Sequence, residues 1–227
     1  LAYLHLIGHM GVGKMVENLK SYYFPSKYSH VKRFVGMCMP CFLMHRSSRK
    51  NILGDYPIPN FPMEEVSMDL AENLNMIKGF QHLLIIQCVL SDYIFIYPMK
   101  SKTSKEFEHI LLYSFLQPFN IKRIHSDNGP VFRNKSWLKI LSALGIKVIN
   151  SSSNNPSSRG KAERAVQQVK LIMKKILASA SSKTLNWEYV PFLVSKVMNQ
   201  SITPRTGFRP AEMVFGKGVL SESFLDL

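Results

Sequence analysis

The chain has 227 residues, of which 46% are hydrophobic and 19% charged, so it can build a buried core and does not have the composition of a disordered protein. Lysine and arginine number 29 against 15 acidic residues, a net charge of +14 that favours a polyanionic partner, nucleic acid before an anionic membrane surface. The longest apolar runs, 83–90 and 93–98, fall far short of the roughly 20 residues that span a bilayer, so we expect no membrane-spanning helix.

Cysteine content and the start of the chain bear on its compartment. Three cysteines cannot build a closed disulfide framework, which indicates a reducing, intracellular environment. The chain opens at Leu1 without the basic and apolar regions of a signal peptide, and the missing initiator methionine predicts a fragment or a processed product.

A proline-rich segment divides the sequence. Residues 55–62 include three prolines within six positions, a composition typical of an extended linker. We therefore predict a small module over residues 1–50, a linker over 51–62, a larger domain over 63–218 and a short tail over 219–227.

The small module contains two pairs of metal-ligand residues. His5 and His9 are four positions apart and share one face of a helix or turn, and Cys38 and Cys41 have the spacing that lets two thiolates reach one ion. Four nitrogen and sulfur ligands suit tetrahedral Zn²⁺ and leave no open position, so we predict one structural zinc ion. The other histidines of this region, without a paired spacing, are His30 and His45.

Basic and aromatic residues are interleaved in the segment between the histidine pair and the cysteine pair. They could contact phosphate groups, or they could form the solvated surface of a small helical bundle, and the sequence leaves both interpretations open. These residues are Lys14, Lys20, Lys27, Lys32 and Arg33, with Tyr22, Tyr23, Phe24 and Tyr28.

The larger domain has a mixed α/β pattern. We expect a strand at 66–71, then strands at 83–90 and 93–99 that form a hairpin around Ser91-Asp92. After them we expect a helix at 105–119, a strand at 121–125, a helix at 135–144, a strand at 146–149 and a long helix at 160–180. Apolar residues recur at a 3.6-residue period along the last helix, which predicts that it packs on the sheet. The polar stretch 150–158 before it is expected to form a loop.

Three carboxylates occupy rigid positions in this pattern. Asp69 lies on the first strand, Asp127 directly follows a strand, and Glu163 lies in the first turn of the long helix. Each has an ordinary structural explanation, as a strand residue, a turn residue or a partner of the helix dipole. Together they fit the needs of phosphodiester chemistry with two divalent ions, which requires clustered carboxylates on rigid elements.

The spacing of 35 residues between Asp127 and Glu163 resembles the Asp, Asp, 35, Glu core of retroviral and LTR-retrotransposon integrases. The motifs that carry the resemblance are Asp127-Asn128-Gly129, Asn155-Pro156 and Gly160-Lys161-Ala162-Glu163-Arg164 in the core, and His5-x3-His9, Tyr22-Tyr23-Phe24-Pro25 and Cys38-x2-Cys41 upstream. The segment 206–216 is similar to the end of the core in Ty3/Gypsy and BEL/Pao elements. The resemblance covers nearly the whole chain.

This resemblance implies an α/β fold with a ribonuclease H-like core, a mixed five-stranded sheet flanked by helices, preceded by a small helical zinc-binding domain. It implies that Asp69, Asp127 and Glu163 are catalytic and hold two Mg²⁺ or Mn²⁺ ions. Water would trim the end of the element DNA, and the freed 3′-hydroxyl would attack target DNA. The implied partners are element and target DNA and further copies of the chain, from a dimer to a tetramer, acting in the nucleus.

One face of the long helix extends from Glu163 into a basic strip, because the residues concerned are spaced by four, three and four positions. Two further basic residues flank Glu163 from the loop, and we expect loop residues 151–158 to be mobile when free and ordered by DNA. The predicted DNA-binding residues are Arg159, Lys161, Gln167, Lys170 and Lys174.

Two other functions are compatible with the sequence. A domesticated or degenerate copy could bind DNA, or a protein, without catalysis. A ribonuclease H-type nuclease acting on hybrids would share the two-metal chemistry but would not explain the zinc module. The chain ends at Leu227, soon after the predicted core, which suggests a truncated element.

Overall fold

The computed structural model describes residues 1–6, 8–44, 58–72, 79–150, 156–179 and 189–216, without the side chains at 150, 156–162, 177 and 179. The chain divides into two compact units, residues 1–51 with 169–227 and residues 52–168. The domain boundaries from the sequence stay a prediction, and the tail and most of the linker lie outside the described residues. No helix within the described ranges has both the length and the apolar character that crossing a membrane requires.

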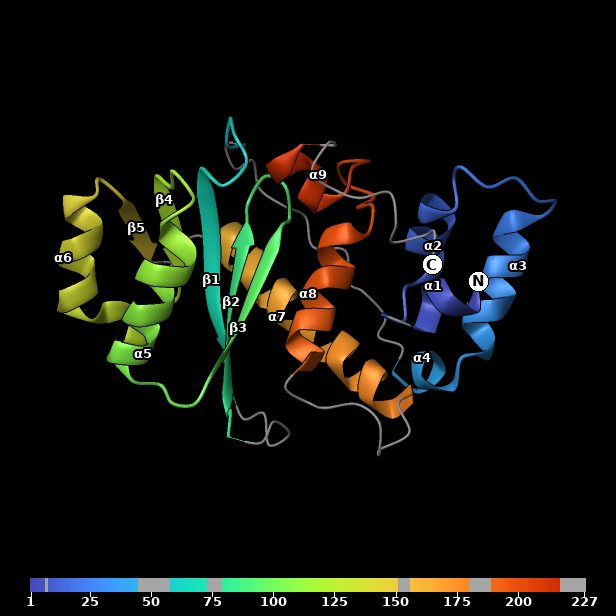
Figure 1. Cartoon of the computed structure of the whole chain (residues 1–227), viewed down its shortest axis with the longest axis horizontal. Coiled ribbons are helices and arrows are strands. Elements are labelled where there is room, and N and C mark those ends of the chain that lie inside the picture. The colour runs from blue at the N-terminus through green and yellow to red at the C-terminus, as the bar shows by residue number, and fades with distance from the viewer. Residues whose placement is uncertain (7, 45–57, 73–78, 151–155, 180–188, 217–227) are drawn as a thin grey trace. The chain divides into compact units, whose positions relative to one another are not determined.

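A five-stranded mixed sheet forms the centre of the unit 52–168 (Figure 1). Its strands are β1 (Glu65–Ala71), β2 (His82–Cys88), β3 (Ile94–Met99), β4 (Arg123–Ser126) and β5 (Lys147–Asn150). They lie in the order β3-β2-β1-β4-β5, antiparallel on the β3 side of β1 and parallel on the β5 side. This confirms the mixed five-stranded sheet expected from the sequence.

Burial explains why the strands form where they do. All seven residues of β2 are buried, and the run Leu83–Ile86 is no more than 1% exposed, as in sheets that are covered on both faces. The predicted hairpin is confirmed, since β2 and β3 pair antiparallel. Its turn contains Asp92 with a φ of 62°, a left-handed conformation that aspartate tolerates better than most residues.

Short helices accompany the sheet in this unit. They are α5 (Ser104–His109), the π-helix η1 (Ile110–Leu116), the 3-10 helix η2 (Pro130–Arg133) and α6 (Lys135–Ala143). The helix predicted at 105–119 is therefore present, but it widens into a π-helix at Ile110 and ends at Leu116. Phe107 of α5 packs edge-to-face against Phe132 and Trp137, and all three rings are no more than 1% exposed. These aromatic contacts tie α5 to η2 and α6.

The long helix α7 (Pro156–Ser179) is present, but it begins four residues before the predicted start. Proline is well suited to the first position of a helix because its φ is already helical and its missing N–H is not needed there. The prediction of a loop through residue 158 was therefore wrong for Pro156–Ser158, and residues 151–155 lie outside the described part. Arg159 and Lys161 belong to the helix, and Glu163 lies beyond the first turn. The buried stripe of α7 is Ala165, Val166, Val169, Met173 and Ile176.

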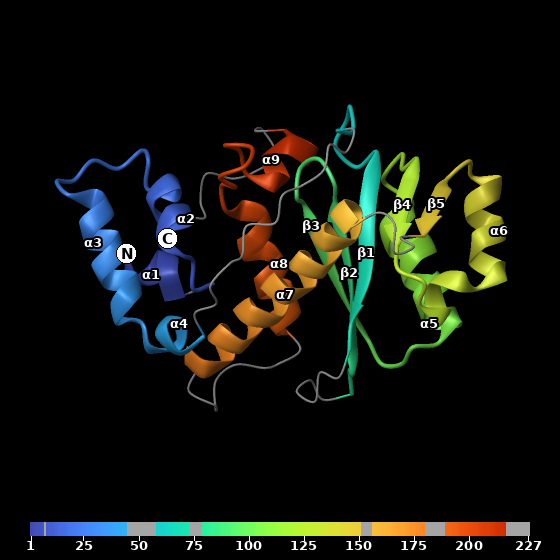
Figure 2. The same cartoon turned by 180° about the vertical axis from the view of Figure 1, so that it is seen from behind.

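The other unit contains four short N-terminal helices, seen together in Figure 2. They are α1 (Ala2–Leu6), α2 (Val12–Asn18), α3 (Lys27–Met37) and α4 (Met39–Leu43), and the same unit includes α8 (Val190–Gln200) and α9 (Pro210–Phe215). Their core cluster is Leu4, Met10, Met15 and Val31 together with Val197 of α8. A Cβ on Gly8 would lie 2.3 Å from Cγ1 of Val197, so only glycine fits at this position.

Candidate metal centres

The first site begins with two buried histidines at the end of α1. His5 is the fourth residue of α1 and 0% exposed, and His9 follows the helix and is 3% exposed. The backbone turns sharply there, because the N–H of His9 donates to the carbonyl of His5 at 2.6 Å and His9 has a φ of 48°. The turn brings both imidazoles to one side, as the spacing predicted.

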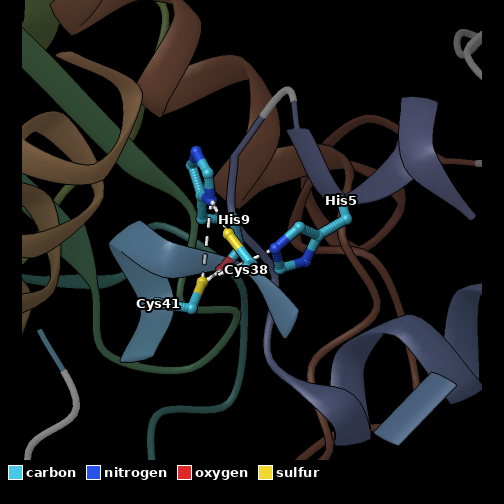
Figure 3. A group of neighbouring side chains, drawn as sticks. All are labelled: His5, His9, Cys38 and Cys41. Carbon is cyan, nitrogen blue, oxygen red and sulfur yellow. Dashed lines mark hydrogen bonds between the residues drawn. The ribbon is translucent and has the colours of Figure 1, made fainter. Parts of the chain in front are cut away.

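Two cysteines approach these histidines from α4. Cys38 precedes the helix and Cys41 lies within it, so a single helical turn directs both thiols to the imidazoles (Figure 3). The Sγ atom of Cys38 is 3.3 Å from Nδ1 of His9, and the Sγ atom of Cys41 is 3.5 Å from Nε2 of His5 and 3.6 Å from Nδ1 of His9. All four ligand atoms lie within 4.8 Å of one another.

These distances fit zinc. With Zn–N bonds near 2.05 Å and Zn–S bonds near 2.3 Å, a tetrahedral ion separates its nitrogen and sulfur ligands by about 3.6 Å. The hydrogen bond from Nδ1 of His5 to the Met10 carbonyl, at 3.0 Å, selects the tautomer that leaves Nε2 able to bind a metal. The four residues can therefore hold zinc without rearrangement.

The protonation states of the histidines also suit metal binding. Burial lowers the pKa of His5, and the Met10 carbonyl partly opposes that shift. Burial, followed by the nearby charges of His5 and Lys175, lowers the pKa of His9 to about 4. Both imidazoles are thus neutral at pH 7, with a lone pair for a metal ion.

Cys41 differs, since burial raises the pKa of its thiol. A thiolate is the form that binds zinc, so uptake of the metal must release a proton from this side chain. Zinc affinity is therefore expected to fall as the pH falls.

Part of the basic and aromatic group in this module has internal partners. Lys20 pairs with Glu17 at 3.2 Å, and Lys27 donates to the carbonyl of Leu19 at 2.8 Å and lies 5.7 Å from the centre of the Phe24 ring. These contacts favour a structural role for these two lysines. His30 is exposed on α3 and outside the ligand cluster, and His45 lies outside the described residues.

The second site centres on two carboxylates, one within β1 and one directly after the neighbouring parallel strand β4. Asp69 is half-buried in β1, and its Oδ1 accepts from the N–H of Leu70 at 2.7 Å. Asp127 directly follows β4 and is exposed, and its Oδ1 accepts from the N–H of Gly129 at 2.9 Å. A Cβ at position 129 would lie 2.9 Å from that oxygen, so glycine keeps the turn open.

The strand register relates these two aspartates. The parallel ladder ends with Ser67 of β1 opposite His125 of β4, and continuation of this register by two residues would set Asp69 level with Asp127. Neighbouring strands are about 4.8 Å apart, and residues at one level of a parallel pair direct their side chains to the same face. The register therefore predicts that the two carboxylates lie side by side just beyond the end of the ladder.

Glu163 lies on a separate element, α7, and its side chain is exposed. Among the described residues, only the histidine and cysteine cluster brings three or more potential ligands close enough to hold one metal ion. Glu163 and the two aspartates are not gathered into such a group. The predicted strip beyond it is open to solvent, with Gln167 and Lys174 exposed and Lys170 partly exposed. The side chains of Arg159 and Lys161 lie outside the described part of the chain.

A third group was missed by the sequence analysis. The buried carboxylate of Glu65 pairs with the guanidinium of Arg123 and with Nε2 of His125. The signal was present in the sequence, since acidic residues precede Asp69 by four and five positions and basic residues precede Asp127 by the same offsets. These equal offsets indicate paired residues only if the two strands are known to be parallel neighbours.

Two protein families match the chain in sequence. Residues 1–47 match the integrase zinc binding domain, and residues 59–156 match the integrase core domain. The Pro-Pol polyprotein of feline foamy virus is 24% identical over 215 residues, which are 93% of this chain and 18% of the viral polyprotein. The retrovirus-related Pol polyprotein from the gypsy transposon of Drosophila melanogaster is 30% identical over 151 residues, 64% of this chain and 14% of that protein. The chain thus spans less than a fifth of these relatives.

Two solved structures share the fold. The intasome of simian T-cell lymphotropic virus, in complex with the PP2A regulatory subunit B56 gamma, aligns with a TM-score of 0.66 and 15% identity over 93% of this chain and 71% of that chain. The catalytic core domain of BIV integrase aligns with a TM-score of 0.53 and 21% identity over 66% of this chain and 92% of that chain. These likenesses agree with a ribonuclease H-like core and a helical zinc-binding domain.

Proposed function

Because the chain belongs to the integrases of retroviruses and LTR retrotransposons, we propose that it is the zinc-binding and catalytic part of a retrotransposon integrase, which trims element DNA and joins it to target DNA. The observation that supports the proposal is the parallel register of β1 and β4, whose continuation by two residues would bring Asp69 and Asp127 to the same level. Paired carboxylates on a rigid sheet are the ligands that divalent-metal phosphodiester chemistry requires.

In this function Asp69, Asp127 and Glu163 are the catalytic residues. They would hold two Mg²⁺ or Mn²⁺ ions, which supply Lewis-acid stabilisation of the attacking and leaving oxygens. The exposure of Asp127 and Glu163 leaves room for a DNA strand to enter. The zinc module, with one structural ion, has no open ligand position and takes no chemical part.

Two successive phosphoryl transfers make up the reaction. In end trimming, a water molecule loses a proton as its oxygen bonds to phosphorus, and the bond from phosphorus to the 3′ oxygen of the element strand breaks. That 3′ oxygen takes up a proton and becomes a hydroxyl. In joining, this hydroxyl loses its proton and its oxygen bonds to a target phosphorus, while the target 3′ oxygen leaves and is protonated. No covalent bond to the enzyme forms in either step.

DNA contacts are assigned to the strip on α7 and to the residues beside it. Gln167, Lys170 and Lys174 would contact phosphate groups, with Arg159 and Lys161 nearer to Glu163 on the same helix. The net charge of +14 supports this partner. Concerted joining of two DNA ends calls for more than one copy of the chain, a dimer to a tetramer, and action on chromosomal DNA calls for the nucleus.

The test is Mn²⁺-dependent strand transfer by the full chain on a short duplex. Asp69→Asn and Asp127→Asn should each lower activity about 1,000-fold or more, since each removes several kcal/mol of transition-state stabilisation. Asp92→Asn is the matched control, because asparagine suits the left-handed backbone of that turn. Activity of Asp127→Asn equal to that of the control would exclude the proposed site. Binding of DNA without any strand transfer by the wild type would favour a non-catalytic DNA-binding protein.

A further inference from the structure

Glu65 is a carboxylate buried in the centre of the sheet. It opens β1, is 1% exposed and sits directly opposite Arg123 in the parallel ladder. Its Oε2 accepts a hydrogen bond from Nε2 of His125 at 2.8 Å, and its Oε1 accepts from the guanidinium of Arg123. Burial of a charge is costly unless partners compensate it, so a carboxylate retained here with two cationic or donor partners indicates a specific role.

Glu65 shares a face of the sheet with the two aspartates. Side chains alternate along a strand, so Glu65 and Asp69, four positions apart in β1, point to the same face. Arg123, His125 and Asp127 are likewise spaced by two, and the first two bind Glu65. By this alternation, the contacts of buried Glu65 with Arg123 and His125 lie on the face of the sheet that carries Asp69, and the same spacing assigns Asp127, just after β4, to that face; the Arg123 side chain itself is 40% exposed.

The pairing that aligns the aspartates is short. The ladder between β1 and β4 runs only from Glu65 opposite Arg123 to Ser67 opposite His125. A slip of one residue would turn Asp127 to the other face, and a slip of two would move it by roughly 7 Å along the strand. Either change would separate it from Asp69, so something beyond three ladder positions has to fix the register.

We propose that Glu65 is a positioning residue for the divalent-metal site. By binding Arg123 and His125 of β4, it fixes the register between β4 and β1 and keeps Asp127 beside Asp69. The inference rests on the proposed function, because it assigns Glu65 a task in the same metal site. It does not require Glu65 to touch a metal ion or DNA.

A neighbouring ion pair provides the control. Glu64 and Lys122 directly precede β1 and β4, and Glu64 binds Lys122 at 3.1 Å; the Lys122 side chain is 59% exposed, against 40% for Arg123. Glu64 also accepts from the backbone N–H groups of Asn60 and Phe61, at 2.8 and 3.3 Å, which the amide oxygen of glutamine can replace. Glu64→Gln therefore removes one charge next to the same strands without disturbing the buried pairs.

The experiment measures Mn²⁺ affinity by calorimetry, and kcat and KM for strand transfer, on the full chain. Glu65→Gln should weaken Mn²⁺ binding about 10- to 100-fold, the usual effect of removing a group that supports metal ligands. The loss should appear in kcat, with KM for DNA unchanged. Glu64→Gln should match the wild type in both measurements, and Asp127→Asn should lose metal binding and activity altogether.

A second pair of variants covers the case in which Glu65→Gln does not fold. The side-chain amide of glutamine at position 125 can donate to Glu65 as Nε2 of His125 does, whereas leucine cannot. His125→Gln should therefore retain Mn²⁺ affinity that His125→Leu loses. Equal affinity in these two variants would overturn the inference.

The outcomes separate the inference from the proposed function. If Glu65→Gln behaves like Glu64→Gln while Asp127→Asn is inactive, Glu65 has no positioning role and the proposed function stands. If Asp127→Asn binds Mn²⁺ and transfers strands like the wild type, the proposed site fails and the inference fails with it.

Discussion

The two candidate metal centres are built in opposite ways. The zinc ligands come from one compact module, three of the four are less than a tenth exposed, and nitrogen-to-sulfur distances between them are 3.3, 3.5 and 3.6 Å. The carboxylates come from two strands and a separate helix, and Asp127 and Glu163 are exposed. A closed set of ligands suits an ion that holds a fold together, and an open set suits ions that must meet a substrate.

The largest expected effect comes from removing one ligand of the zinc site. Cys41→Ser should abolish zinc binding and the helical signal of α1–α4, because structural zinc contributes apparent folding free energies of about 10–16 kcal/mol in small modules. Zinc per chain and far-UV circular dichroism measure the two losses. His30→Ala, at an exposed histidine outside the cluster, should keep both. One zinc ion per chain in the Cys41→Ser protein would contradict the assignment.

Variants of the carboxylate site should behave differently, because they should lose strand-transfer activity and keep the fold. Glu163→Gln removes a charge from an exposed position of α7, so thermal unfolding should change little and strand transfer should fall about 1,000-fold or more. The double variant Glu163→Gln/Gln167→Glu moves the carboxylate by one helical turn, roughly 6 Å. The double variant should remain inactive. Recovered strand transfer would show that any carboxylate on this face of α7 supports the reaction and that position 163 itself is not required.

Acid should distinguish the two regions by a smaller effect. The pKa of His9, about 4, lies below its ordinary value of 6.5, so the unfolded module takes up a proton more readily than the folded one. The stability that neutral His9 contributes is complete above pH 6.5 and is lost as the pH falls toward 4. Because protons compete with zinc for the His9 nitrogen and the Cys41 sulfur, we expect zinc release and loss of α1–α4 as the pH falls. Fluorescence of the buried Trp137, measured in a Trp187→Phe background, should change only at lower pH.

The smallest effect is expected on the strip of α7. Lys174→Ala should weaken binding to duplex DNA a few-fold and lower the slope of log affinity against log salt by about 1, as for the loss of one phosphate contact. Lys102→Ala is the control, because Lys102 pairs with Glu72. Fluorescence anisotropy at several salt concentrations measures both variants. Equal slopes for the two would remove Lys174 from the DNA contacts.

Local patterns in the sequence predicted much of the fold. The run Leu83–Ile86 and the hairpin at Asp92 were predicted because burial and turn preference act over a few residues. The zinc ligands were predicted for a similar reason, since each pair closes within one turn. The predicted start of α7 was wrong. The polar composition before Glu163 favours a loop, but Pro156 suits the first position of a helix, and the helix begins there.

Features that depend on long-range contacts could not be predicted from the sequence. Whether Asp127 lies level with Asp69 depends on which strands are neighbours and in which register, and 57 residues lie between the two positions. The role of Glu65 was missed for the same reason, because a glutamate at the start of a strand is ordinary until its partners on β4 are known. The π-helix that begins at Ile110 has no local signature that distinguishes it from a continued α-helix.

The backbone hydrogen bonds at the two aspartates affect the entropy of metal binding. Oδ1 of Asp69 is bound by the N–H of Leu70, and Oδ1 of Asp127 by the N–H of Gly129, so each hydrogen bond restricts the rotation of its carboxylate. A side chain that is ordered beforehand loses less conformational freedom on binding, a saving of about 0.5–1.5 kcal/mol for each immobilised group. The backbone next to each ligand thus contributes to cation affinity through order rather than through charge.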